Sequence, residues 1–167
     1  ITQNEELFKR IETVYNGRNK AKLNAEQKRL VWRYYTNFVR AGAKLDADKK
    51  KRLSEINQTL AGLYTRFSQN LLVDETELFM VLKSEDELAG LPQSLKDAAA
   101  QAAKSKNLEN SWVILNTRSS VEPFLTYADR RDLREKAFQM FVNRGDNGDK
   151  NDNNAIISEV LQLRVER

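Results

Sequence analysis

Residues 53–72 read LSEINQTLAGLYTRFSQNLL, and this stretch decides the fold class. Its large apolar residues recur every three or four positions, at Leu53, Ile56, Leu60, Leu63, Tyr64, Phe67 and Leu71. Such spacing places them on one face of an α-helix. Asp46 is a residue type that caps helix starts. We therefore expect a helix from Asp46 to Leu71, about 40 Å long at the usual rise per residue.

Two shorter helices are expected before the long one. Asn4 can cap the first, which ends at Asn16-Gly17, and Asn24 with Gln27 forms a capping-box pattern for the second, which ends at Gly42. The apolar positions of the first are Leu7, Phe8, Ile11, Val14 and Tyr15, and the inward stripe of the second is Leu30, Val31, Tyr34, Phe38 and Ala41. Because the following link is short, we expect the second helix and the long helix to form an antiparallel hairpin.

The pattern changes after the long helix. Two short apolar runs, Leu78–Leu82 and Trp112–Leu115, predict an antiparallel β-ribbon, which needs helices packed over it to be stable. Between them, Ser84 and Glu87 indicate a short capped turn or helix, and the alanine-rich stretch after Pro92 favours a helix.

The last third of the chain is expected to be helical again. One helix begins near Val121, where Pro123 favours it, and Asp129 can cap the next. A polar loop over residues 145–152 precedes a last helix that begins near Asn153. No repeat or low-complexity linker divides the chain. We expect residues 1–167 to be a single, mainly α-helical segment: a helical bundle with a long antiparallel hairpin and a small two-stranded ribbon.

The composition excludes several classes of site. The 167 residues include no cysteine and no histidine, which removes thiol chemistry, the commonest general base and the commonest catalytic zinc ligand. The net charge is +4, but the 28 basic residues are interleaved with 24 acidic ones along the sequence. A phosphate-binding face needs segregated charge, so we expect no nucleic-acid partner. No apolar run reaches the roughly 18 residues of a membrane span.

Three local motifs have weak functional interpretations. A calcium loop starting at Asp149 would need Gly at its sixth position and Glu at its twelfth, where the chain has Asn154 and Val160. The basic run Lys49–Arg52 lies beside acidic residues in the first turns of the long helix, which is typical of a solvated face. The glycosylation pattern Asn57-Gln58-Thr59 falls in the middle of that helix.

Aromatic and acidic groupings in the sequence also have weak functional interpretations. The rings of the second helix could stack on a ligand, but we interpret them as helix-packing core; they are Trp32, Tyr34, Tyr35 and Phe38. The acid pairs Glu5–Glu6 and Asp146–Asp149 have no neighbours that would separate their pKa values, as acid–base catalysis requires. The sequence thus predicts no catalytic, cofactor-binding or metal-binding residue in this chain.

Four longer stretches carry a resemblance that covers nearly the whole chain. They are LVWRYYTNFVRAGAKL (residues 30–45), the stretch at 53–72 quoted above, WVILNTRSSVEPFLTYADRRDLREKAF (residues 112–138) and NDNNAIISEVLQLRVER (residues 151–167). In this order they resemble the thimet oligopeptidase family of zinc metallopeptidases, and within it the peptidyl-dipeptidase branch. The resemblance implies an interior fragment of a larger, two-lobed helical enzyme, upstream of its His-Glu-x-x-His helix.

The resemblance also implies a function for the parent enzyme. Zinc in the parent would cleave short peptides and release dipeptides from their C-termini, while this segment would contribute scaffold and channel wall. We expect the segment alone to be inactive, to hold no cofactor and to pack against the rest of the parent polypeptide. The expected compartment is the cytoplasm, with the periplasm as the alternative. The rival hypothesis is a stand-alone helical protein-interaction module.

Overall fold

The computed structural model describes residues 4–167, and they are mainly α-helical, as predicted. Two compact units are distinguished: residues 1–61 with 166–167, and residues 62–165. The helix α3 (Ala47–Glu77) contributes its first half to one unit and its second half to the other. The prediction of one segment without an internal boundary stays a prediction. Within residues 4–167, no helix combines the length and apolarity that membrane crossing requires.

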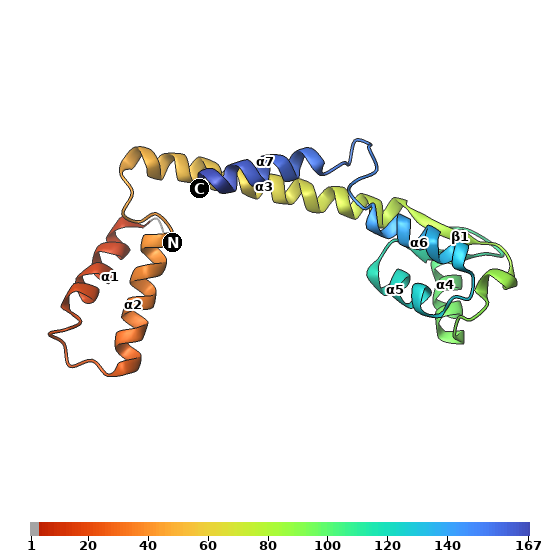
Figure 1. Cartoon of the computed structure of the whole chain (residues 1–167), viewed down its shortest axis with the longest axis horizontal. Helices are drawn as coiled ribbons and strands as arrows, with labels where there is room; N and C mark the ends of the chain where they lie inside the picture. The colour runs from red at the N-terminus through yellow and green to blue at the C-terminus, as the bar shows by residue number, and fades with distance from the viewer. Residues whose placement is uncertain (1–3) are drawn as a thin grey trace. The chain divides into compact units, whose positions relative to one another are not determined.

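The first unit contains a helical hairpin of α1 (Glu5–Gly17) and α2 (Ala25–Arg40), which lie side by side in Figure 1. Both predicted N-caps are confirmed: the Asn4 side chain accepts from the Leu7 amide at 2.9 Å, and Asn24 and Gln27 form the full capping box. Gly42 has a φ of 92°, the left-handed conformation expected after the second helix.

The partner of α2 differs from the prediction. We expected α2 to pair with α3, but its aromatic residues pack on α1 instead. The Tyr35 ring stacks on Tyr15 with centroids 3.7 Å apart, and Phe38 stacks on Phe8 at 6.1 Å. These stacked rings supply the apolar contact that fixes the hairpin.

The long helix is also longer than predicted. It continues for six residues after Leu71, the last position of the apolar spacing, and ends at Glu77. The next inward position, three residues on, is held by Asp74, whose side chain is 2% exposed and hydrogen-bonded by a distant loop. At this inward position a buried carboxylate with hydrogen-bond partners thus takes the place of an apolar side chain.

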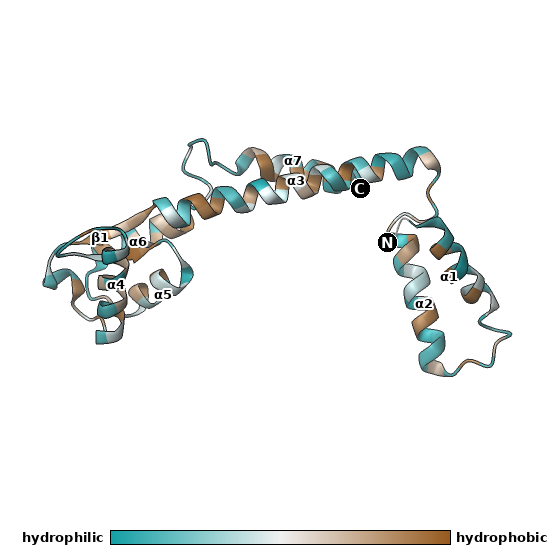
Figure 2. Ribbon diagram, turned by 180° about the vertical axis from the view of Figure 1, so that it is seen from behind, coloured by the Kyte–Doolittle hydropathy of each residue, from teal (hydrophilic) through white to brown (hydrophobic). Residues whose placement is uncertain are grey.

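The second unit is built on the predicted ribbon. β1 (Phe79–Leu82) and β2 (Trp112–Leu115) pair antiparallel, with Phe79 opposite Leu115 and Leu82 opposite Trp112. The helices α4 (Gln93–Ser105) and α5 (Arg118–Tyr127) pack on β2, and α6 (Arg131–Val142) packs on β1, so all three gather around the ribbon in Figures 1 and 2. The 3-10 helix η1 (Glu85–Leu88) and α7 (Asn154–Glu166) complete the chain.

Strand and helix side chains share one core in this unit. Its buried members are Leu82, Leu88, Leu91, Ala99, Ile114, Val121, Phe124, Ala128, Leu133 and Ala137. Both Val113 and Ile114 are fully buried, so β2 is covered on its two faces. Helices on both sides therefore stabilise a ribbon that would be marginal alone.

Two helix starts in this unit were predicted wrongly. The helix expected near Val121 begins three residues earlier, at Arg118, so Pro123 lies inside it. The residue at the N-cap of α6 is Arg130 instead of Asp129, and the Arg130 side chain makes no capping hydrogen bond. The Asp129 amide donates to the Ala89 carbonyl at 2.9 Å, a contact from outside the helix that local capping rules do not foresee.

Candidate functional site

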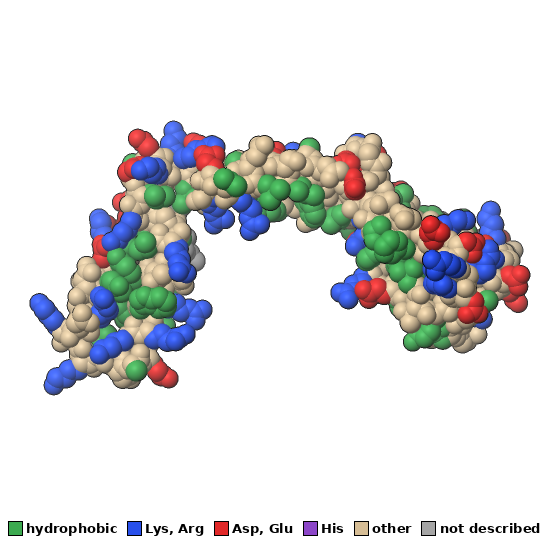
Figure 3. All heavy atoms as spheres, viewed as in Figure 1, with side chains coloured by type: hydrophobic (Ala, Val, Ile, Leu, Met, Phe, Trp, Pro, Cys, Tyr) green, Lys and Arg blue, Asp and Glu red, His purple; other side chains and the backbone are tan. Residues whose placement is uncertain are grey.

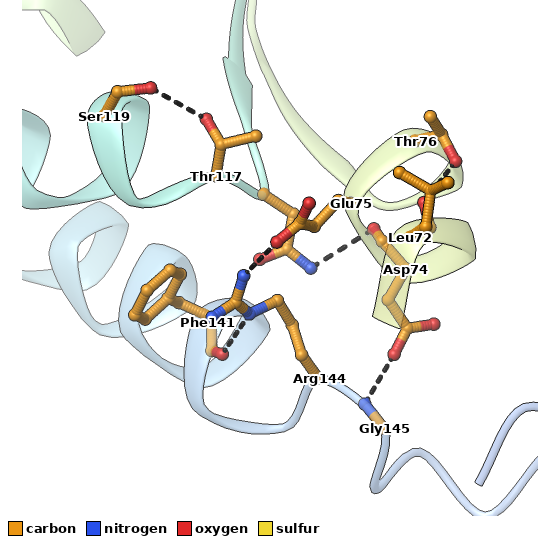
Figure 4. Close-up of polar contacts among 10 residues, drawn as sticks. Leu72, Asp74, Glu75, Thr76, Thr117, Ser119, Phe141, Arg144 and Gly145 are labelled. Atoms are coloured by element: carbon orange, nitrogen blue, oxygen red, sulfur yellow. Dashed lines mark hydrogen bonds and ion pairs between the residues drawn. The ribbon is translucent and has the colours of Figure 1, made fainter. Parts of the chain in front are cut away.

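A buried polar junction in the second unit joins the end of α3 to the loop that follows α6. Asp74 provides its centre: one carboxylate oxygen accepts from the Gly145 amide at 2.7 Å and from the Asn147 side chain at 2.9 Å. In Figure 4 this carboxylate points from α3 toward Gly145. Three further side chains of the junction come from separate parts of the sequence: Asn116, Arg144 and Asn153.

Asn153 ties the same loop to an earlier turn of α3. It is 1% exposed; its side-chain amide donates to the Phe67 carbonyl at 3.3 Å, and its oxygen accepts from Asn70 at 2.9 Å. Gly145 has a φ of 72°, and a Cβ there would lie 2.7 Å from the Asn153 side-chain nitrogen. Glycine is therefore required at this crossing for both conformation and space.

Arg144 closes the junction on its partly exposed side. Its guanidinium donates to Glu75 at 2.5 Å and to the Phe141 carbonyl at 3.1 Å, and its central carbon lies 4.1 Å from the centre of the Phe141 ring. Figure 4 shows the guanidinium between these two partners. The planar group is suited to such a combination of ion pair, hydrogen bond and ring contact.

The junction positions polypeptide and has no features of a catalytic site. The Asp74 carboxylate is almost fully buried and engaged by backbone and amide donors, so it is not accessible to a substrate. The fully buried Asn116 donates to the Asp74 carbonyl at 3.3 Å, while its side-chain oxygen has no partner among the described residues. The geometry fixes the loop over residues 143–153 against α3.

A surface hollow of about 780 Å³ lies beside the start of β2. Lys83 and Lys104 line it together with Glu109, and the Trp112 side chain forms part of its wall. The Ser111 hydroxyl is buried there without a partner among the described residues. These side chains include no nucleophile hydrogen-bonded to a base, so the hollow does not have the arrangement needed for covalent catalysis.

The acidic loop after α6 folds on itself. The Asp146 carboxylate accepts from the Asn154 side chain at 2.6 Å, and the Asp149 carboxylate accepts from the Asn151 amide at 2.7 Å. Among residues 4–167, no group of three His, Cys, Asp or Glu side chains is placed to hold a metal ion. These carboxylates form turns, and the residues present do not fit a catalytic zinc.

The basic run in α3 is matched by acids in the first unit. Lys49 pairs with Asp46 at 3.0 Å, and Lys50 pairs with Glu5 at 2.7 Å. The Arg52 guanidinium contacts Glu166 through two hydrogen bonds, which raises the pKa of Arg52. Three of the four basic residues of the run thus form ion pairs, in agreement with the solvated-face interpretation.

The glycosylation pattern lies within the helix α3, as expected. The Thr59 hydroxyl, part of this pattern, donates to the Glu55 carbonyl one turn earlier, at 3.0 Å. The backbone here is helical, whereas a glycosylation acceptor is normally found on a surface loop.

The aromatic residues of α2 divide into two sets. Tyr35 and Phe38 pack in the hairpin, as the core interpretation predicts. Trp32 and Tyr34 are 51% and 54% exposed, so for these two the prediction of core was wrong. The expected inward stripe of α2 is likewise wrong at Leu30, which is 55% exposed.

Known proteins match the chain over its whole length. It is 34% identical to the dipeptidyl carboxypeptidase of Escherichia coli over all 167 residues, and 33% identical to the oligopeptidase A of the same organism over 99% of the chain. The organellar oligopeptidase A of Arabidopsis thaliana is 32% identical over all of the chain. The match covers 24%, 25% and 22% of these relatives, so the chain spans about a quarter of their length. No family model matches it.

Proposed function

Because the chain is homologous over its entire length to part of the proteins of the thimet oligopeptidase family, we propose that it is a non-catalytic segment of a zinc metallopeptidase. The continuous match across the whole chain carries this proposal, since it includes both units and every helix and strand described above. The names of the relatives support peptide cleavage as the activity of the complete protein.

In this proposal zinc belongs to another part of the complete protein. The sequence has no histidine or cysteine, and no three acidic side chains of residues 4–167 are grouped so that they could hold a metal ion. A catalytic zinc polarises the scissile carbonyl and acidifies its bound water, which needs ligands that this chain does not provide. The segment alone is therefore inactive.

The segment's own role is scaffold and channel wall. The polar junction holds the α3 end and the loop over residues 143–153 in one arrangement. Large apolar side chains remain exposed on the second unit, among them Leu72 at 58% and Leu161 at 59%. Apolar surface of this kind is typical of a packing face, and the remaining polypeptide would cover it. The proposed substrates are short peptides, from whose C-termini the complete protein releases dipeptides. The proposed compartment is the cytoplasm, with the periplasm as the alternative.

The inactivity of the segment is directly testable. The purified chain is incubated with zinc and a blocked tetrapeptide, with the Escherichia coli dipeptidyl carboxypeptidase as the positive control. We expect dipeptide release by the control alone. Stoichiometric zinc uptake with turnover by the 167-residue chain would overturn the proposal.

The reading frame that encodes the chain distinguishes the proposal from the stand-alone interaction module. The proposal requires a downstream His-Glu-x-x-His sequence in that frame, and peptidase activity in the polypeptide expressed from it. A frame without this motif would favour the interaction module, whose binding surface would be the exposed apolar side chains of α2.

A further inference from the structure

The hairpin of α1 and α2 carries an apolar groove that is distinct from its aromatic interface. The groove has a volume of about 260 Å³, and its lining residues are Arg10, Ile11, Val14, Leu30, Val31 and Tyr34. Five of these six residues are apolar or aromatic. On each helix the third lining residue lies four and three positions after the first two, so the three share one helix face.

The groove is uncovered in the described chain. Val14, Leu30 and Tyr34 are each more than half exposed. The hairpin closes instead through Phe8 and Phe38, which are 7% and 5% exposed. Each helix thus has an apolar face wider than the one its partner covers, and Figure 2 shows apolar residues along both. A helix with such a wide apolar face packs on more than one neighbour.

The hairpin also carries the surplus of positive over negative charge in this chain. Residues 4–45 include ten Lys and Arg against four Asp and Glu, whereas the rest of the chain has eighteen against twenty. On the face shown in Figure 3, Lys and Arg side chains surround the apolar ones of this hairpin. The surplus charge is therefore concentrated on the hairpin that carries the groove, although the sequence as a whole looks interleaved.

The carboxylates of α1 pair with lysines and leave the arginines of the two helices without an ion pair among the described residues. Glu5 pairs with Lys50 at 2.7 Å, Glu6 with Lys9 at 3.1 Å and Glu12 with Lys44 at 3.1 Å. Across residues 4–167, no ion pair joins a carboxylate to the remaining arginines of the two helices, which are Arg10, Arg29, Arg33 and Arg40. A partner that supplies carboxylates beside an apolar ridge would complement this surface.

We propose that this groove docks an amphipathic helix from the remainder of the same polypeptide, with an apolar ridge flanked by carboxylates. The inference rests on the proposed function, because it requires the further three quarters of length found in the relatives. A groove of this size seats one or two large side chains, which is the geometry of an apolar helix ridge entering a helix-lined groove.

Other occupants fit the surface less well. A second copy would bring one cationic hairpin against another, which like-charge repulsion opposes. Nucleic acid would meet a lining that is mostly apolar, whereas phosphate contacts come from charged and polar groups. An anionic bilayer is best contacted by the convex apolar face of a single amphipathic helix, and this surface is a concavity between two.

Thiol labelling of the complete polypeptide tests the docking. Val14→Cys and Leu30→Cys are made in the 167-residue chain and in the full reading-frame product, with Lys20→Cys in the exposed loop as the matched control and the unsubstituted proteins as blanks. We expect maleimide to label both groove positions about 100-fold more slowly in the complete polypeptide, where only local opening exposes them. The control should react equally in both. Equal labelling of all three positions would overturn the docking, while retained peptidase activity would leave the proposed function intact.

Charge-reversal variants and cross-linking identify the segment that occupies the groove. In the complete polypeptide, Arg10→Glu with Arg33→Glu should speed labelling of Val14→Cys about tenfold, because carboxylates would then face carboxylates. Lys104→Glu, in the second unit, should leave it unchanged. A photo-cross-linker at position 34 should join the groove to an acidic amphipathic helix within the same polypeptide. Cross-links between copies, or binding of the isolated chain to RNA or anionic vesicles at physiological salt that the double substitution abolishes, would contradict the proposal.

Discussion

The second unit and the α1–α2 hairpin bury their apolar side chains to different extents. In the second unit, strand and helix side chains such as Leu82, Ile114 and Phe124 are fully buried, because helices cover both faces of the ribbon. In the hairpin, Phe8 and Phe38 are buried while Val14 and Leu30 remain more than half exposed. The comparison teaches that one region has its own core, whereas the hairpin leaves part of its apolar surface uncovered.

The number of packed layers explains this difference. Two helices bury one stripe each, and any second apolar stripe needs a further layer. The ribbon of the second unit has those layers in α4, α5 and α6. The same substitution should therefore lower the free energy of unfolding more at a covered position than at an uncovered one.

The largest effect is expected at Phe124, which is fully buried in the core of the second unit. Phe124→Ala should reduce the free energy of unfolding by about 3 to 5 kcal/mol, since it removes a large buried ring and leaves a cavity. Phe138→Ala, the same change at a side chain that is 48% exposed on α6, should cost far less. Urea unfolding of both variants measures the difference; equal losses would mean that the core is not where burial places it.

Removing the Asp74 carboxylate should have the next largest effect. Asp74→Ala leaves the Gly145 amide and the Asn147 side chain without their acceptor, and each buried unsatisfied group costs about 1 to 3 kcal/mol. Asp97→Ala, on an exposed face of α4, is the matched control and should be near neutral. Hydrogen exchange at Gly145 should accelerate in the Asp74 variant alone. Unchanged exchange there would refute the anchoring role of this carboxylate.

The sequence predicted the elements better than their partners. Caps at Asn4, Asn24 and Asp46 depend on residues three positions apart, and each is confirmed. The ribbon was likewise predicted from two short apolar runs. The pairing of α2 with α1 was missed, because helical spacing identifies an apolar face without saying which neighbour covers it.

The polar junction and the positive charge of the hairpin were also missed, for different reasons. Asp74 occupies the inward register three residues after Leu71, so a polar residue continuing an apolar stripe was an available signal. Its partners, Gly145 and Asn147, lie some seventy residues away, and no local rule connects them. The charge surplus of residues 4–45 was visible in the sequence but was averaged out when the whole chain was counted.

Within the hairpin, neighbouring tyrosines should behave differently. Tyr35→Leu removes the stacking on Tyr15 and Phe8, and each aromatic pair contributes about 0.5 to 1.5 kcal/mol beyond burial. Tyr34→Leu, one position along, changes a ring that is 54% exposed and should leave the hairpin unaffected in the 167-residue chain. Hydrogen exchange of the α1 and α2 amides measures the local stability. A larger loss from Tyr34→Leu would reverse the assignment of the two faces of α2.

The smallest expected effect is that of low pH on the free energy of unfolding, and it should appear in both regions. Hydrogen bonds from Arg130 lower the pKa of Asp132 from its ordinary 3.8 to about 2, and the Lys50 ammonium lowers the pKa of Glu5 in the hairpin. Because a lowered pKa favours the ionised folded state, this stabilisation is present above the unfolded pKa, and for Asp132 it is lost as the pH falls from about 4 to about 2. Both carboxylates are exposed, so water screens the pairs and the change is small. Asp132→Asn should therefore slightly reduce the pH dependence of the free energy of unfolding in the second unit and leave that of the hairpin unchanged. Glu5→Gln should have the opposite pattern. If either substitution changed both regions equally, the two regions would unfold as one.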